Sequence, residues 1–277
     1  MSSKFICPVV KWVGGKRQLL DVIENHIPNN FDTYCEPFVG GGALLFHIKP
    51  QKAVINDINS ELVNVYNIIK NNLDELLEDL KTHENEAEYF YKIRAADRDK
   101  KEYDRLSNVE KASRILYLNK TCYNGLFRVN KSGEFNTPFG RYKNPNIVNE
   151  TILTAVSEFF NKNNIIFYNK DFEDILKKLE SGTFVYLDPP YDPISDTSSF
   201  TGYDKGGFNK REQKRLKKAC DELDKNKIKF LLSNSNTDLI NDLYKNYSIE
   251  TIKAKRSINS IASKRGGIDE VLVRNYE

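Results

Sequence analysis

The sequence has few of the residues that would hold a metal or cross a membrane. Its four cysteines lie far apart, and neither they nor the three histidines have the spacing of zinc ligands. We therefore expect no metal site, and we interpret the cysteines as reduced thiols of a cytoplasmic protein. No apolar run approaches the roughly 20 residues that span a bilayer, and the N-terminus has no apolar signal-peptide core. A membrane protein is thus not expected.

Positive charge is concentrated in parts of the chain, although the formal net charge is only +3. Residues 71–110 hold seven basic and twelve acidic side chains, whereas residues 205–265 hold sixteen basic and seven acidic ones. Residues 119–145 hold five basic side chains and one acidic one. Such segregation is typical of a surface that binds a polyanion, but solvated lysine-rich helices give the same pattern.

Predicted strands and helices alternate over most of the chain. The expected strands are residues 31–38, 53–57, 165–168, 183–187, 228–232, 247–252 and 269–276, and the expected helices are 43–48, 59–70, 171–179, 209–224 and 237–244. This alternation predicts a doubly wound α/β sheet. Residues 61–145 break the rhythm with few strands, so we expect one domain formed by 1–60 and 146–277 and an inserted domain at 61–145.

The most informative motif is Asp188-Pro189-Pro190-Tyr191, which directly follows the apolar run 184–187. Prolines hold the backbone rigid and leave its carbonyl oxygens free as acceptors. A carboxylate, a carbonyl and an aromatic ring at the end of a strand could bind the N–H groups of an exocyclic amine while the ring stacks on its base. A strand that ends in a proline turn with a surface tyrosine is the alternative interpretation.

A second set of residues indicates a nucleoside-like cofactor. The segment Glu36 to Gly42 ends in three glycines at a strand-to-helix turn, where backbone N–H groups can approach a ligand. Neither this turn nor Gly14-Gly15-Lys16 has the spacing of a phosphate-binding loop, which disfavours a nucleotide triphosphatase. Asp57 ends the next strand, where dinucleotide folds place the acid that binds ribose hydroxyls. Asp171 either accepts a hydrogen bond from an adenine amine or caps its helix. Together these residues suit an adenosine that carries something other than a pyrophosphate, and S-adenosylmethionine fits that description.

Six motifs occur in a fixed order: 11–16, 36–42, 56–59, 123–128, 140–143 and 188–191. In this order and spacing they resemble the Dam-type DNA adenine-N6 methyltransferases, in particular the branch that modifies the adenine of GATC. The likeness extends from about residue 10 to the C-terminus. It implies a Rossmann-like, S-adenosylmethionine-dependent methyltransferase sheet with an inserted, mainly helical target-recognition domain at 61–145.

The resemblance also implies roles for individual residues. The implied catalytic residues are Asp188, Pro189, Pro190 and Tyr191. The implied contacts to S-adenosyl-L-methionine are Trp12, Lys16, Phe38, Gly40, Gly42, Asp57 and Asp188, to which the residue pattern adds Asp171. The implied DNA contacts are Lys11, Tyr123, Asn124, Arg128, Pro138, Arg141 and Lys143.

The function implied is transfer of the methyl group of S-adenosylmethionine to the N6 amine of a flipped adenine in duplex DNA, within GATC. The alternatives are a methyltransferase acting on cytosine N4, RNA or protein glutamine, and an inactive DNA-binding relative. The implied partners are double-stranded DNA and a restriction endonuclease that acts on the same site. The expected location is the cytoplasm, at the nucleoid. The sequence leaves open whether the enzyme serves restriction, repair or a phage.

Overall fold

The structure, a computed structural model, describes residues 5–12, 14–16, 18–194, 207–255 and 267–277. Val13 and Arg17, next to predicted site residues, lie outside the described residues, and so does part of the basic segment 205–265. The chain divides into two compact units. Unit 1 is formed by Met1–Gly15, Val39–Gln51 and Asp57–Asn169, and unit 2 by Lys16–Phe38, Lys52–Asn56 and Lys170–Glu277. The boundaries of the predicted insert, 61–145, stay a prediction.

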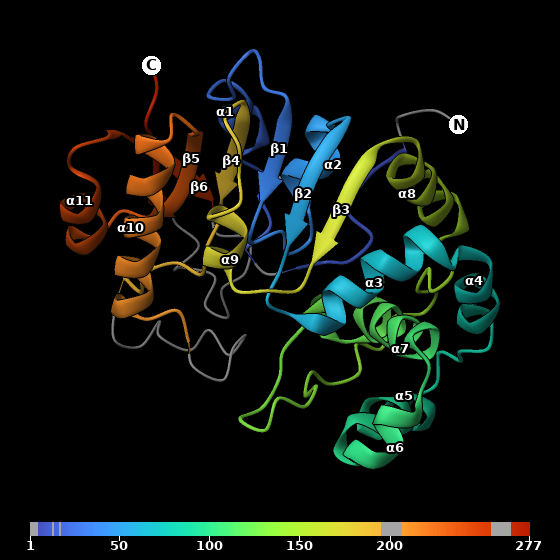
Figure 1. Cartoon of the computed structure of the whole chain (residues 1–277). Helices are drawn as coiled ribbons and strands as arrows, with labels where there is room; N and C mark the ends of the chain where they lie inside the picture. Colours follow the sequence, from blue (N-terminus) through green and yellow to red (C-terminus); the bar gives the residue numbers. More distant parts are fainter. Residues whose placement is uncertain (1–4, 13, 17, 195–206, 256–266) are drawn as a thin grey trace. The chain divides into compact units, whose positions relative to one another are not determined.

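Unit 2 contains a mixed β-sheet with helices (Figure 1). Its strands are β1 (Thr33–Glu36), β2 (Lys52–Asn56), β4 (Thr183–Leu187), β5 (Lys229–Ser235), β6 (Ser248–Lys255) and β7 (Gly267–Arg274), and its helices are α1 (Leu20–Glu24), α9 (Phe172–Leu176), α10 (Lys210–Lys225) and α11 (Asp238–Tyr244). These strands lie in the order β2-β1-β4-β5-β7-β6. The first four are parallel, whereas β7 runs antiparallel to both β5 and β6.

The middle of this sheet defines an edge suited to ligand binding. All residues of β1 and β4 are buried, as expected for parallel strands that are covered on both faces. Because β1 and β4 are parallel neighbours, their carboxyl ends lie at the same edge, where the chain continues into Pro37 and Asp188. The chain proceeds from β1 to β2 on one side and reaches β4 on the other, which makes this position a topological switch point.

Unit 1 is mainly helical. Its elements are α2 (Ala43–Ile48), α3 (Ser60–Asn71), α4 (Leu73–Lys81), α5 (Ala87–Ala95), η2 (Ala96–Arg98), α6 (Lys100–Arg105), α7 (Asn108–Thr121), η3 (Tyr123–Gly125), α8 (Glu150–Lys162) and β3 (Asn164–Tyr168). Helix α7 packs against α3, α4 and α5 and is largely buried. Its start is fixed by a capping box, in which Ser107 and Glu110 each bond the other's backbone N–H.

The α/β class predicted from the sequence is confirmed, and each predicted strand and helix is present. The first strand is shorter than expected, 33–36 instead of 31–38, and helix α9 ends at Leu176 instead of residue 179. The interval 61–145 contains helices and two isolated β-bridges, Cys122 with Phe139 and Val129 with Phe135, but no strand. Its predicted helical character is therefore confirmed.

Candidate functional site

The carboxylate of Asp188 is held on one of its two oxygens. Lys16 Nζ lies 2.8 Å from Asp188 Oδ1 in an ion pair whose side chains are 8% and 19% exposed. The Ser233 hydroxyl, near the carboxyl end of β5, donates to the same Oδ1 over 3.0 Å. In the described part of the chain, no donor reaches Oδ2. One oxygen is thus anchored, and the other has acceptor capacity to offer a ligand.

The two proline carbonyls after Asp188 differ in their partners. The carbonyl oxygen of Pro190 accepts a 3.0 Å hydrogen bond from Nε2 of Gln213, a fully buried residue of α10. No described donor bonds the carbonyl of Pro189. The next residue, Asp192, is fixed by Asn234 Oδ1, which accepts from its backbone N–H, and by the Thr237 hydroxyl, which donates to its carboxylate. Of the two proline carbonyl oxygens, that of Pro189 is thus the one available to accept a hydrogen bond from a ligand.

The ring of Tyr191 is fixed by contacts at its hydroxyl and on one face. The hydroxyl donates a 2.8 Å hydrogen bond to Glu270 Oε2 on β7. Lys16 Nζ lies over the ring, 4.6 Å from its centroid. Burial, followed by the charges of Asp188 and Glu270, raises the pKa of Tyr191 well above its usual value, so the phenol stays protonated. A base that stacks on Tyr191 must use the opposite face or displace Lys16.

In unit 1, the glycine turn and Asp57 form one hydrogen-bonded structure. Asp57 Oδ2 accepts from the backbone N–H of Gly40, and Oδ1 accepts from that of Asn59, both at 2.9 Å. Burial raises the pKa of Asp57, and these backbone hydrogen bonds partly offset the rise. A carboxylate only accepts hydrogen bonds, and each of its oxygens can take more than one. Asp57 therefore fits the hydroxyl donors of a ribose.

Two of the glycines are required by the backbone of this turn. Gly40 has a φ of +47°, and a Cβ there would lie 2.9 Å from Trp12 Cδ1. Gly42 has a φ of +69°, and a Cβ there would lie 3.0 Å from the Phe46 ring. Left-handed backbone and close contacts both favour glycine. The hydroxyl of Tyr66, on α3, donates to the Gly40 carbonyl over 2.7 Å and holds the turn in place.

Trp12 joins the glycine turn to the predicted DNA-binding loop. Its ring stacks on that of Phe127, with centroids 4.8 Å apart and an interplanar angle of 23°. The adjacent Lys11 exchanges backbone hydrogen bonds with the Asn119 side chain and lies 5.9 Å from the centroid of Tyr142. Motifs that the sequence places far apart thus meet within unit 1.

The predicted DNA contacts lie on or beside the loop between η3 and α8. Tyr123 is 55% exposed, and its backbone N–H bonds the carbonyl of Pro138 over 2.8 Å. Asn124 and Arg141 have left-handed backbones, with φ values of 56° and 55°. Lys143, another predicted DNA contact, is exposed. This loop presents polar and basic side chains on the surface of unit 1.

Arg128 is exposed but bonded within the loop. Its Nε donates to Asn136 Oδ1 over 2.7 Å, and its Nη2 donates to the Asn136 carbonyl over 3.3 Å. In turn the Asn136 N–H donates to the carbonyl of Arg128 over 2.9 Å. The guanidinium is therefore oriented before any ligand arrives, with its Nη1 side unused by these contacts.

Two predicted cofactor residues in unit 2 have structural contacts. The ring of Phe38 packs against Phe172 and Phe208, at centroid distances of 5.4 and 5.7 Å. Asp171 caps α9 by accepting from the Glu173 N–H, and its Oδ1 also accepts from Arg215 Nη2 over 2.9 Å. The capping interpretation of Asp171 is confirmed, and its role toward a cofactor stays a prediction.

Several residues that position the site were missed by the sequence analysis. They are Gln213, Ser233, Asn234 and Glu270, and Asn56, which lies in the motif 56–59, was given no role. Asn56 is buried, and its side-chain amide donates to the carbonyls of Pro37 and Lys170, which holds both segments of unit 2 in place. A signal for Ser233 and Asn234 was available, because polar residues directly follow the apolar stretch 230–232 of a predicted buried strand.

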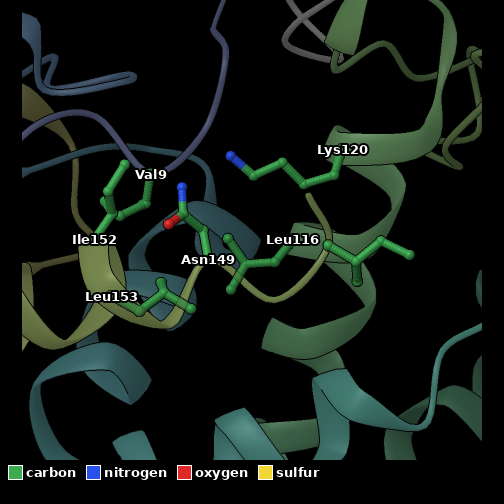
Figure 2. A pocket seen from close by; sticks show the side chains of 7 residues that line it. Val9, Leu116, Lys120, Asn149, Ile152 and Leu153 are labelled. Carbon is green, nitrogen blue, oxygen red and sulfur yellow. The ribbon is translucent and has the colours of Figure 1, made fainter. Parts of the chain in front are cut away.

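Other features carry no predicted site residue. Figure 2 shows a recess in unit 1 that is lined mainly by apolar side chains, among them Val9, Leu116 and Leu153, with Lys120 at its side. The described residues contain no cluster of His, Cys, Asp and Glu that could hold a metal ion. Within the same described residues, no helix is long and apolar enough to cross a membrane.

Residues 12–258 match the family model of the D12 class N6 adenine-specific DNA methyltransferases. The chain belongs to this family. The methyltransferase is 46% identical over 271 residues to the Type II methyltransferase M1.LlaDCHI of Lactococcus lactis subsp. cremoris, which covers 97% of this chain and 95% of that protein. It is 43% identical to the Type II methyltransferase M.MjaIII of Methanocaldococcus jannaschii, over 97% of this chain and 99% of that protein. It is also 35% identical to the DNA adenine methylase of Escherichia coli K12, over 95% and 93% of the two chains. The methyltransferase therefore acts on adenine in DNA and uses a methyl donor.

Proposed function

We propose that this methyltransferase transfers the methyl group of S-adenosylmethionine to the N6 amine of an adenine flipped out of duplex DNA, within GATC. One observation carries the chemistry: Asp188 is anchored through Oδ1, and its Oδ2 and the Pro189 carbonyl have no described partner. Two acceptors on adjacent residues match the two N–H groups of an adenine amine. The base specificity rests on the resemblance of the six motifs to the GATC-modifying branch.

The residues of the Asp188–Tyr191 segment have distinct parts in this proposal. Asp188 Oδ2 and the Pro189 carbonyl accept the N–H groups, which favours a pyramidal nitrogen and frees its lone pair. The Tyr191 ring stacks on the base and offsets part of the few kcal/mol that flipping costs. Because the ring is held by Glu270 and Lys16, little conformational freedom is lost when the base binds.

The residues present fit S-adenosylmethionine as the methyl donor. Bound, it supplies a methyl group on a positively charged sulfur. We assign Asp57 to the ribose hydroxyls, because its carboxylate can accept more hydrogen bonds than the two from Gly40 and Asn59. The other members of the proposed cofactor set are Trp12, Lys16, Phe38, Gly40, Gly42, Asp171 and Asp188. Lys11, Tyr123, Asn124, Arg128, Pro138, Arg141 and Lys143 form the proposed DNA set. The insert at 61–145 is the proposed target-recognition domain.

The experiment that tests this proposal combines the purified chain, labelled S-adenosylmethionine and short duplexes. One duplex carries GATC, and others each carry a single substitution in this site. A control duplex carries GATC that is already methylated on both strands. We expect the label to be transferred to the unmodified GATC duplex. Sequencing that detects N6-methyladenine should then locate the methyl group on the adenine of this site. Transfer to cytosine or RNA, or DNA binding with no transfer, would contradict the proposal.

A cognate nuclease is a separate part of the proposal. Two relatives are named Type II methyltransferases, and we propose by analogy that this enzyme protects DNA from an endonuclease acting on the same site. DNA from cells that express the chain should then resist a GATC-cutting nuclease that is blocked by adenine methylation. Full cleavage of that DNA would contradict the GATC assignment and, with it, protection at GATC.

A further inference from the structure

A buried hydroxyl pair lies behind the carboxylate of Asp188. Ser233, on β5, is fully buried, and Tyr186, on β4, is 1% exposed. The Tyr186 hydroxyl lies 3.2 Å from Ser233 Oγ, and Ser233 Oγ lies 3.0 Å from Asp188 Oδ1. The three groups form a chain that starts in the core of the sheet and ends at the proposed acceptor of the substrate amine.

The direction of the protons in this chain follows from the chemistry of its members. A carboxylate can only accept, so the single proton of the Ser233 hydroxyl points toward Asp188. Ser233 Oγ must then accept from Tyr186, whose hydroxyl keeps its proton because burial, followed by the charge of Asp188, raises the pKa of this phenol well above its usual value. In this arrangement each of the two hydroxyls donates one hydrogen bond.

Fixing one oxygen of Asp188 fixes the other. The terminal torsion angle of an aspartate side chain has a broad distribution, so contacts with neighbouring groups determine the orientation of the carboxylate. Lys16, the other partner of Oδ1, has a long flexible side chain whose ammonium can follow a rotating carboxylate. Ser233 has a short side chain on a buried strand and cannot follow it in the same way.

We propose that Ser233, supported by Tyr186, is a positioning residue that sets the orientation of the Asp188 carboxylate and so directs Oδ2 at the adenine amine. This inference rests on the proposed function of Asp188. It assigns to β5 a part in the reaction that lies outside the six motifs. Ser233 does not touch the substrate in this proposal and acts through Asp188, although its hydroxyl also interacts with that of Tyr191.

The direct test is Ser233→Ala, measured as single-turnover methyl transfer to a GATC duplex. Loss of one hydrogen bond to a charged group should lower the rate about 10- to 100-fold. The KM values for DNA and for S-adenosylmethionine should stay within about twofold, because the interaction acts on the reacting group. The matched control is Ser235→Ala, two residues further along β5 and also buried, whose hydroxyl has no described partner. It should keep the parental rate.

A second variant separates positioning from stability. Ser233→Ala alone leaves the buried Tyr186 hydroxyl without its acceptor, which lowers the melting temperature. The double variant Tyr186→Phe/Ser233→Ala removes both groups and should regain most of that stability while its rate stays as low as that of Ser233→Ala. If the rate returns together with the melting temperature, Ser233 has only a structural role and the inference is overturned.

Asp188→Ala, assayed in parallel, distinguishes the role of Ser233 from that of Asp188. If Asp188→Ala is inactive while Ser233→Ala keeps the parental rate, the positioning role is wrong and the proposed function stands. If Asp188→Ala is fully active, the proposed function of Asp188 is wrong and the role of Ser233 fails with it. An inactive Asp188→Ala, a slow Ser233→Ala and an equally slow double variant together support the inference.

Discussion

The ammonium of Lys16 lies over the ring of Tyr191, with Nζ 4.6 Å from the ring centroid, while the same atom pairs with Asp188 at 2.8 Å. One cation therefore contacts both the acceptor and the aromatic member of the Asp188–Tyr191 segment. It compensates the charge of Asp188, which is largely shielded from water. Substitutions in this segment consequently affect its neighbours as well as the residue changed.

Replacing Asp188 should stop methyl transfer and leave DNA binding largely intact. Asp188→Asn preserves the shape and one acceptor for Lys16 and Ser233, but puts an N–H donor where the proposed substrate amine needs an acceptor. DNA affinity should change little, because phosphate contacts elsewhere supply most of it. Transfer of labelled methyl and gel-shift titration measure the two properties. Near-normal turnover of Asp188→Asn would rule out this acceptor role.

Replacing Asp57 should weaken cofactor binding. Asp57→Ala removes a charge-assisted acceptor and also leaves the N–H groups of Gly40 and Asn59 without partners. Calorimetry should show at least about tenfold weaker S-adenosylmethionine binding, with the fold checked by circular dichroism. Asp74→Ala, an exposed acid on α4, is the matched control and should bind normally. Equal affinity in a folded Asp57→Ala protein would remove Asp57 from the cofactor set.

The same carboxylate predicts a pH dependence of cofactor affinity. Burial raises the pKa of Asp57, so the protonated form, which accepts less strongly, is reached on acidification earlier than for an ordinary aspartate. The affinity for S-adenosylmethionine should therefore begin to fall at a higher pH than it would if Asp57 had the usual aspartate pKa. Calorimetric titrations at a series of pH values test this, and affinity that stays constant down to about pH 4 would contradict it.

Arg128 provides a test of base reading against phosphate binding. A base-reading arginine changed to Ala loses about 1–3 kcal/mol of discrimination at one base pair, whereas loss of a phosphate contact weakens all sequences alike. We expect the first result, because Asn136 already orients the guanidinium. Methylation of GATC and its single-substitution variants by Arg128→Ala measures it. Arg105→Ala, on α6, serves as an exposed control. A uniform fall over all duplexes would favour the phosphate role.

His83 should make the stability of the protein depend on pH. Its ring bonds Tyr89 and Ser113 and stacks on Tyr117, and burial lowers its pKa despite the nearby charge of Asp79. The unfolded chain binds a proton near the usual value of about 6.5, whereas the folded chain resists it to lower pH. Stability should thus decrease as the pH falls below about 6.5. Urea unfolding over this range should show a flatter dependence for His83→Gln, and parallel curves would show that His83 is not responsible.

The sequence predicted the elements well and the contacts around the site poorly. Strand β4 was predictable because an apolar run ends at an acid and two prolines, and helix α3 because Asn59 supplies a cap. The polar residue after the apolar stretch 230–232 marked the position of Ser233, but the partners of Ser233 and Glu270 were not predictable, because they depend on which strands pair and on the face that each side chain takes. The contact between Arg128 and Asn136 was missed for a related reason, since it depends on the backbone path of an irregular loop.

The position of Trp12 between the glycine turn and the ring of Phe127 has a thermodynamic consequence. A shift of this one indole changes its packing against Gly40 and against Phe127 together. If the methyl donor binds at the glycine turn and DNA at the loop around Phe127, as proposed, the two binding events would share a coupling free energy through Trp12. Linkage requires the coupling to be reciprocal: the factor by which the methyl donor alters the affinity for DNA equals the factor by which DNA alters the affinity for the methyl donor.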